Sequence, residues 1–252
     1  MRDFETIAQK LVAFIQNAVK NRGFDAVVFG LSGGIDSAVV ARLCQLAFKD
    51  SHKALMLPSR QSSKESLEHA LELCEKFGIQ NEIISISAPQ DAFLETLPNL
   101  AQSQIRLGNL CSRLRMICLY DYAFANNALV VGTSNKSEIL LGYGTIYGDL
   151  ACAINPIGNL YKTEIYKLAK VLEIPQSIMQ KAPSADLYAG QSDEEELGFS
   201  YATLDRIMLL LLEGKDDVAI LAQGLPKDAL NLVRTRMKHF AFKQKMPDIA
   251  QI

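Results

Sequence analysis

The residue types best suited to chemistry lie in one short stretch, Gly30-Leu31-Ser32-Gly33-Gly34-Ile35-Asp36-Ser37. An apolar run, residues 26–29, precedes it, and a run with helical spacing, residues 38–48, follows it. A strand, a glycine-rich turn and a helix together present backbone N–H groups to a phosphate at the helix N-terminus. Glycine lets the backbone approach an anion because it has no side chain and accepts positive φ. The stretch predicts a phosphate-binding loop; the alternative is a turn that caps an ordinary helix.

The acidic residue of this loop narrows the prediction. No Gly-Lys-Ser/Thr sequence closes the stretch, so it is not a Walker A loop. A carboxylate at Asp36, beside a phosphate, requires a cation between them, and Mg²⁺ is the usual one. The stretch resembles the pyrophosphate-binding loop of the ATP pyrophosphatase families, which cleave ATP between the α- and β-phosphates and form adenylates.

Composition excludes several classes of protein. The chain has 252 residues and a net charge of -2, which argues against binding of nucleic acid through bulk charge. The first residues are not a signal peptide, and the apolar run 207–212 is too short to cross a membrane. We therefore expect a cytoplasmic protein with no membrane or nucleic-acid partner. Its length fits a single domain, residues 1–252.

The five cysteines form no C-x-x-C pair. Their odd number and their position in mainly apolar helical runs indicate buried, reduced thiols and not metal ligands or nucleophiles. The positions are Cys44, Cys74, Cys111, Cys118 and Cys152.

Strands and helices alternate along the chain, which predicts an α/β fold with a doubly wound parallel sheet and helices on both faces. Helices are expected over residues 3–20, 38–48, 64–77, 102–126 and 163–172. Strands are expected over residues 26–29, 54–57, 82–86 and 128–131, with a further short element at 155–157. In a five-stranded sheet of order 3-2-1-4-5, the first and fourth strands are neighbours. The loops after them then share the crevice in which such sheets bind ligands.

The loop after the fourth strand, Gly132-Thr133-Ser134-Asn135-Lys136-Ser137-Glu138, forms a second constellation. Its residues have an ordinary alternative role, because Thr133 and Ser134 suit a helix cap and Glu138 suits the helix dipole. Opposite Asp36, however, Glu138 would give Mg²⁺ a second carboxylate.

An ordered set of motifs then identifies a family resemblance. The motifs are Ser-Gly-Gly-Ile-Asp-Ser (32–37), Gly-Asn-Leu-Cys-Ser-Arg-Leu-Arg-Met (108–116), Gly-Thr-Ser-Asn-Lys-Ser-Glu (132–138), Tyr-Gly-Asp (147–149), Asn-Pro-Ile (155–157) through Lys162, and Lys-Ala-Pro-Ser-Ala-Asp-Leu (181–187). Together they resemble the NAD⁺ synthetases over nearly the entire chain. The resemblance implies a Rossmann-like adenine nucleotide alpha hydrolase fold.

The resemblance implies ATP-dependent amidation of deamido-NAD with ammonia, through a nicotinate adenylate, to give NAD, AMP and pyrophosphate. It implies catalytic roles for Asp36, Lys162 and Glu138, with Mg²⁺ held by Asp36 and Glu138. The residues expected to bind ATP are Gly30, Leu31, Ser32, Gly33, Gly34, Ile35, Asp36, Ser37, Thr133, Lys162 and Ser184.

The family's residues for binding deamido-NAD are only partly present in this sequence. Arg113 occupies a family position that contacts this substrate, and Arg115 is interpreted as structural or inter-subunit. Relatives have a lysine and an aspartate where this chain has Ile146 and Ala153, and the common His-Lys is Phe242-Lys243. Either other side chains do this work, such as Tyr143, Tyr147, Asp149 and Lys243, or the substrate is held mainly by backbone and by a partner subunit.

The resemblance also implies which nitrogen donor the enzyme uses and how its subunits assemble. Glutamine-dependent members carry an additional amidase domain, for which this chain has no room, so ammonia is expected to be used directly. A homodimer is expected, with the apolar segment 102–126 buried between subunits or within one subunit. Residues 184–198 are predicted to form a lid that excludes water.

Two other classes remain open from the sequence. One is another adenylating ATP pyrophosphatase, such as a GMP synthetase domain or a tRNA-thiolating enzyme. The other is a non-catalytic module that binds ATP without turnover and tolerates Asp36→Ala.

Overall fold

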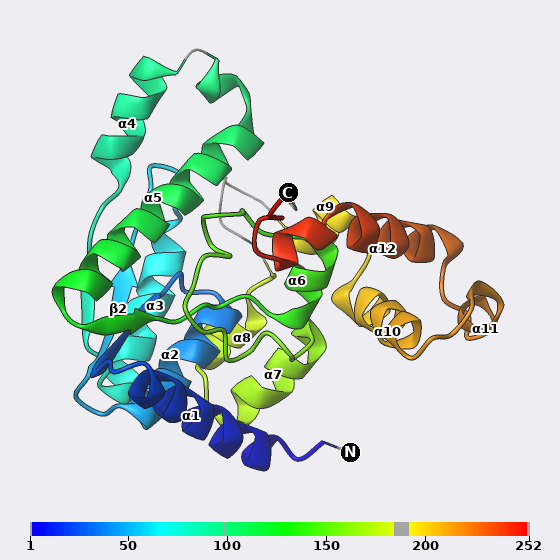
Figure 1. The fold of residues 1–252 in the computed structure, drawn as a ribbon, viewed down its shortest axis with the longest axis horizontal. Helices are drawn as coiled ribbons and strands as arrows, with labels where there is room; N and C mark the ends of the chain where they lie inside the picture. The colour runs from blue at the N-terminus through cyan, green and yellow to red at the C-terminus, as the bar shows by residue number, and fades with distance from the viewer. Residues whose placement is uncertain (1, 98, 184–191, 251–252) are drawn as a thin grey trace.

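A parallel sheet of four strands organises the part of the chain that the structure describes, residues 2–97, 99–183 and 192–250 of a computed structural model (Figure 1). The order is β3-β2-β1-β4. The strands are β1 (Ala26–Gly30), β2 (His52–Met56), β3 (Asn81–Ile83) and β4 (Ala128–Val130). Val27 pairs with His52 of β2 on one side and with Leu129 of β4 on the other. The prediction that the first and fourth strands are neighbours is therefore confirmed.

The expected fifth strand is wrong. At that position the described residues contain one isolated parallel bridge, between Val131 and Ile154. The ladder ends there because Pro156, two residues later, has no N–H to donate. The carbonyl of Ile154 still accepts the N–H of Gly132 at 2.8 Å, so the bridge fixes the start of the loop after β4.

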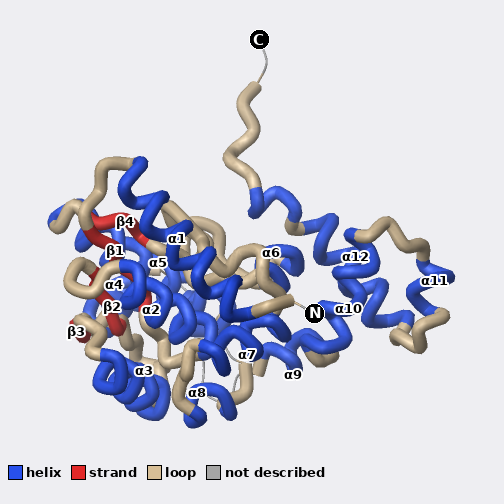
Figure 2. The backbone as a smooth tube through the Cα atoms, turned by 90° about the horizontal axis from the view of Figure 1, so that it is seen from below, coloured by secondary structure: helices blue, strands red, loops and turns tan. Residues whose placement is uncertain are grey.

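Helices cover both faces of the sheet, as Figure 2 shows. Val27 and Phe29 of β1 point into one apolar cluster, together with buried residues of α1 (Phe4–Asn21), α2 (Ile35–Ala47), α3 (Lys64–Phe77) and α7 (Lys162–Val171). Val28 points to the opposite face, where it joins Leu114 of α5 (Gln104–Ala125). This alternation follows from the period of two along a strand.

The remaining helices extend the fold beyond the sheet. They are α4 (Ser87–Thr96), α6 (Lys136–Leu141), α8 (Gln176–Gln180), α9 (Asp193–Leu197), α10 (Tyr201–Leu212), α11 (Asp217–Leu221) and α12 (Lys227–His239), with 3₁₀ turns at Leu100–Gln102 and Ala241–Gln244. α10, α11 and α12 lie together at one side of the molecule (Figure 1). They share a second apolar cluster with α6 and α9. This cluster joins α6, which follows β4, to the C-terminal helices.

Two predictions concern segments at the edge of what the structure describes. Ser184, and the first part of the predicted lid, residues 184–191, lie outside the described residues. The last part forms α9 and the turn that follows it. No helix among the described residues is long and apolar enough to cross a membrane.

Candidate active site

The loop between β1 and α2 is braced by its own serines. The Ser37 hydroxyl donates to the Gly34 carbonyl at 2.9 Å, and its oxygen accepts the Ser32 N–H at 3.2 Å. The Ser32 hydroxyl oxygen accepts the Gly34 N–H at 3.2 Å. These bonds fold residues 32–34 over the first turn of α2, which is the geometry predicted for a phosphate-binding loop.

Gly33 is required at the tip of this loop. Its φ is +81°, and a Cβ there would lie 2.0 Å from the carbonyl oxygen of Ser66. Any other residue would therefore clash with backbone as well as strain its own conformation. The contact fixes the first turn of α3 against the loop.

A buried lysine joins the two acidic residues that the sequence singled out. Lys162 Nζ lies 2.5 Å from Asp36 Oδ2 and 3.4 Å from Glu138 Oε1, although Asp36 and Glu138 are about a hundred positions apart in sequence. Three different elements supply the group: α2, α6 and the first residue of α7. The structure thus brings together all three predicted catalytic residues.

Asn135 links the two carboxylates, and the sequence analysis gave it no role. Its side-chain amide donates to Asp36 Oδ1 at 2.9 Å, while its Oδ1 accepts the Glu138 N–H at 3.0 Å. Its own N–H donates to Glu138 Oε2 at 3.1 Å. This reciprocal pair is the capping box that starts α6. The sequence signal was available, since Asn followed three residues later by Glu marks such a helix start.

The charges in this group are strongly coupled. Burial raises the pKa of Glu138, and the Asp36 carboxylate raises it further against the opposing effect of Lys162. Burial alone would lower the pKa of Lys162, but Asp36 and Glu138 raise it above its usual range. Lys162 is therefore held protonated, and the nearer carboxylate, Asp36, is the main group that compensates its charge.

A third acidic residue near Lys162 is Asp193, at the start of α9, and the sequence analysis gave it no role. Asp193 is 3% exposed and accepts hydroxyl hydrogen bonds from Tyr143 at 3.2 Å and Tyr201 at 3.3 Å. Tyr143 also hydrogen-bonds Glu196. Burial raises the pKa of Asp193, while Lys162 opposes the shift.

The backbone of Lys162 is positioned by a buried network from α10. The Lys162 N–H donates to the Ser137 hydroxyl oxygen at 2.9 Å, and that hydroxyl donates to Asp205 Oδ1 at 2.5 Å. Asp205 Oδ2 accepts the Thr163 N–H at 2.9 Å. One carboxylate thus ties the N-terminus of α7 to α6.

These groups open into a cavity of about 630 Å³. Its walls include Leu57, Met116 and Val131 on the apolar side and the Asp36–Lys162–Glu138 group on the polar side. Predicted site residues that line it are Gly30, Leu31, Ser32, Gly34, Asp36, Ser37, Thr133, Glu138, Tyr143, Asp149, Lys162 and Lys243. Predicted site residues absent from its walls are Gly33, Ile35, Arg113 and Tyr147.

The predicted residues for the second substrate have varied surroundings. Lys243 donates to the carbonyls of Gly142 at 2.9 Å and Gly144 at 2.7 Å, so it holds the 142–150 loop in place. Asp149 accepts the Ser112 hydroxyl at 2.6 Å. Tyr147 is 57% exposed and has a positive φ of 59°.

The two arginines of α5 point in different directions. Arg113 is exposed, on the face that also carries Ile117 and Phe124. Arg115 lines the cavity and donates to the Leu57 carbonyl at 3.0 Å and to the Ser62 hydroxyl at 3.2 Å. Arg115 therefore has structural contacts within its own chain, as one of its two interpretations held.

Comparison with known proteins agrees with this geometry. The family model described as NAD synthase matches residues 7–247. The chain belongs to the NAD synthase family. A curated family member, the NH(3)-dependent NAD(+) synthetase of Wolinella succinogenes, is 54% identical over 247 residues, covering 98% of this chain and 95% of that protein.

Two solved structures of NAD synthase relatives cover the whole fold. The NH3-dependent NAD synthetase of Campylobacter jejuni, in complex with nitrate, is 44% identical with a TM-score of 0.85, over 99% of this chain and 100% of that one. The NMN synthetase of Francisella tularensis is 35% identical with a TM-score of 0.89, over 100% of both chains. The backbone is thus similar to those of two relatives that are named for different nucleotide products, NAD and NMN.

Proposed function

We propose that this chain is an ammonia-dependent NAD synthetase, a ligase that amidates deamido-NAD in the final step of NAD biosynthesis. The observation that carries the proposal is the convergence of Asp36, Glu138 and Lys162 beside a serine-braced loop at the carboxyl ends of β1 and β4. That loop has the form of a pyrophosphate site, and the chain belongs to the NAD synthase family.

The reaction has two steps. A nicotinate carboxylate oxygen attacks the α-phosphorus of ATP, and the bond to the bridging oxygen breaks with its electron pair going to pyrophosphate. Ammonia nitrogen then attacks the carbonyl carbon of the adenylate, the C–O bond breaks, AMP leaves with that oxygen, and one proton is released. Adenylation is needed because a free carboxylate has no adequate leaving group.

The residues at the convergence point fit Mg²⁺. Asp36 and Glu138 supply two carboxylates, and Mg²⁺ is usually bound by one or two carboxylates together with substrate phosphates and water. When bound there, Mg²⁺ would neutralise charge on the ATP phosphates.

The chain's own groups position ATP. The backbone of residues 30–37 lies along the phosphates, with Thr133 at the neighbouring strand end. Lys162 directs its ammonium into the cavity, where it stabilises charge that develops on the transferred phosphoryl group. The apolar wall at Leu57 and Met116 suits an aromatic base.

The second substrate lies against the 142–150 loop in this proposal. Asp149, Tyr143 and Lys243 line the same cavity, whereas Arg113 and Tyr147 are not among the residues that line it. Ammonia reacts directly, and the buried site excludes bulk water that would otherwise hydrolyse the adenylate.

The proposal includes a homodimer built on α5. Ile117 is 55% exposed and Phe124 is 93% exposed, and these side chains lie on one face of the helix. A stripe of large apolar side chains exposed to this extent is typical of a protein–protein interface. Arg113 is exposed on the same face, and in this proposal it contacts deamido-NAD in the partner's site.

The test is an assay for AMP and NAD with ATP, Mg²⁺, ammonia and deamido-NAD. We expect stoichiometric AMP and NAD with ammonia and no product when glutamine replaces it. Nicotinate mononucleotide, offered in competition, tests the product named for the Francisella relative. Absence of AMP with deamido-NAD would overturn the proposal, and ATP binding without turnover would favour a non-catalytic module.

A further inference from the structure

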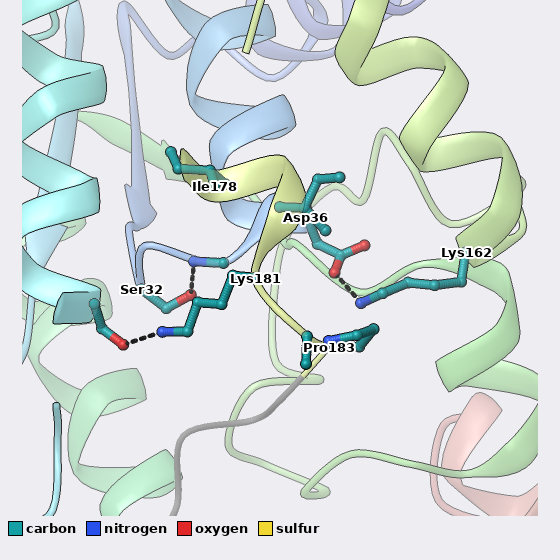
Figure 3. A pocket seen from close by; sticks show the side chains of 10 residues that line it. Ser32, Asp36, Lys162, Ile178, Lys181 and Pro183 are labelled. Carbon is teal, nitrogen blue, oxygen red and sulfur yellow. Dashed lines mark hydrogen bonds and ion pairs between the residues drawn. The ribbon is translucent and has the colours of Figure 1, made fainter. Parts of the chain in front are cut away.

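A small pocket at the phosphate loop contains a second lysine, Lys181. The pocket, of about 30 Å³, lies between Ser32 and Gly34 of the loop and the segment after α8, and Asp36, Lys162 and Lys181 also line it. Figure 3 shows the Lys181 side chain passing beside Ser32, with its nitrogen in a hydrogen bond that Ser66 accepts beyond it. Lys181 belongs to the 181–187 motif, in which only Ser184 was given a role.

The two lysines of this pocket differ in their partners. Lys162 lies between the carboxylates of Asp36 and Glu138, so its positive charge is compensated within the protein. Among the described residues, Lys181 forms no ion pair, and its Nζ donates to the neutral hydroxyl of Ser66 at 2.6 Å. Among the described residues that line this pocket, Lys181 is therefore the cation whose charge is not compensated by a carboxylate.

The position of Lys181 is fixed from both sides. It caps the C-terminus of α8, whose Ile178 is 1% exposed in the core cluster shared with α2. Its hydrogen-bond partner Ser66 is 4% exposed, and the Ser66 carbonyl is the group that closely approaches Gly33. The ammonium is thus held against the tip of the phosphate loop by packing on α8 and α3.

We propose that Lys181 binds the β- and γ-phosphates of ATP and stabilises pyrophosphate as it leaves. This inference rests on the proposed function and deepens it. When the bond between the α-phosphorus and the bridging oxygen breaks, the electron pair and its negative charge pass to pyrophosphate. Lys181 compensates this negative charge without any proton transfer. Lys162 instead acts at its own position between the carboxylates of Asp36 and Glu138.

Lys181→Met tests the assignment, because methionine keeps the apolar stem and removes the charge. We expect kcat/KM for ATP to fall about 10²–10³-fold, as for loss of one group that stabilises developing charge. Binding of inorganic pyrophosphate with Mg²⁺, measured by titration calorimetry, should weaken at least about tenfold, and Lys181→Arg should restore part of it. Lys167→Met, at an exposed position of α7, is the matched control and should leave both quantities unchanged.

Wild-type pyrophosphate affinity and wild-type kcat/KM for ATP in Lys181→Met would overturn the inference. If Lys181→Met does not fold, as judged by circular dichroism, Lys181→Gln and Lys181→Arg are compared in the same titration, and equal affinities would also overturn it. The proposed function fails by a different result, absence of AMP from the wild-type protein. The pyrophosphate titration decides the role of Lys181 independently of that result.

Discussion

At the scale of single residues, the site depends on one side chain that bears no charge. Asn135 has no exposed surface and uses its amide hydrogen on Asp36, its amide oxygen on the Glu138 N–H and its own N–H on the Glu138 carboxylate. It therefore sets the distance between the two carboxylates. Residues that orient metal-binding carboxylates commonly affect metal affinity as strongly as some ligands do.

Asn135→Ser separates this role from helix capping. Serine caps a helix about as well as asparagine, so the loss of stability should be limited to the missing hydrogen bond with Asp36, about 0.5–1.5 kcal/mol. It has no amide to donate to Asp36, so the Mg²⁺ concentration for half-maximal activity should rise about 10–100-fold. Titration of activity with Mg²⁺ measures this, with Ser200→Asn at the exposed end of α10 as a capping control. An unchanged Mg²⁺ requirement would contradict the positioning role.

Those site residues that belong to a local sequence pattern could be predicted from the sequence. Asp36 and Glu138 were found because each follows a strand whose neighbour could be predicted, and Lys162 because of a motif. Asp193 and Lys181 were not found, because packing of α8 and α9 brings them to the site and no local pattern encodes that contact. The assignment of Lys243 to substrate stays a prediction; in the structure its ammonium donates to two loop carbonyls and also lines the cavity.

At the scale of elements, α10 controls the start of α7. Asp205 accepts one hydrogen bond from Ser137 and one from the Thr163 N–H. Both of its oxygens are acceptors, and it is 5% exposed, so an amide cannot replace it without leaving a group unpaired. The helix dipole at the N-terminus of α7 also favours the negative charge.

Asp205→Asn should therefore lower the free energy of unfolding by about 1–3 kcal/mol, the cost of an unsatisfied buried group. It should also lower kcat, because Lys162 adjoins the disturbed turn. Urea denaturation and steady-state kinetics measure the two effects. Asp216→Asn is the matched control, since Asp216 caps α11 at an exposed position and asparagine caps equally well. Equal effects of the two substitutions would argue against the network.

His52, at the start of β2, provides a pH-dependent contribution to stability. Burial lowers its pKa, in opposition to its hydrogen bond with the Phe48 carbonyl. Its Nδ1 lies 2.6 Å from that carbonyl and its Nε2 accepts the Gln80 N–H at 3.3 Å, an arrangement that only the neutral ring satisfies. Below pH 6.5 the unfolded chain binds a proton that the folded chain does not, so stability falls as pH falls.

The measurement is the urea midpoint of wild-type protein and His52→Gln between pH 7.5 and 5.5. Glutamine can donate to the carbonyl and accept the N–H without titrating, so its slope with pH should be shallower. One proton accounts for at most about 1.4 kcal/mol per pH unit. His239→Gln, an exposed site on α12, should keep the wild-type slope. Identical slopes for wild type and His52→Gln would exclude His52 as the source.

Most elements follow from periodicity, and the errors have physical causes. The helix predicted over residues 64–77 is α3, because Ser63 caps it and Gly78 ends it with a positive φ. The fifth strand failed because a proline stops the ladder after a single bridge. α4 was not predicted; its N-cap residue, Ile86, makes no capping side-chain hydrogen bond and its one buried residue is the polar Gln90, which bonds Arg60 and Gln61.

At the scale of the whole molecule, the exposed face of α5 carries more large apolar side chains than is expected of a monomer. Its large apolar side chains include Ile105, Ile117, Tyr120 and Phe124, and they would lie in water if α5 had no partner. Burying them between two copies would remove this surface, since a two-fold interface brings one patch against itself. We therefore expect Phe124→Lys to shift the protein from dimer to monomer in analytical ultracentrifugation. A wild-type protein that sediments as a monomer would contradict the expectation.

The proposed dimer makes a sharper prediction through Arg113, which shares this face and is not among the residues that line the cavity of its own chain. If Arg113 contacts deamido-NAD in the partner's site, Arg113→Ala and Asp36→Asn damage different halves of the same composite site. Each homodimer should then be nearly inactive. A heterodimer of the two, purified through two different tags, contains one intact site and should show about half of the wild-type activity per dimer. If Arg113 serves its own chain, neither site of the heterodimer is intact and activity should stay at the level of the single variants.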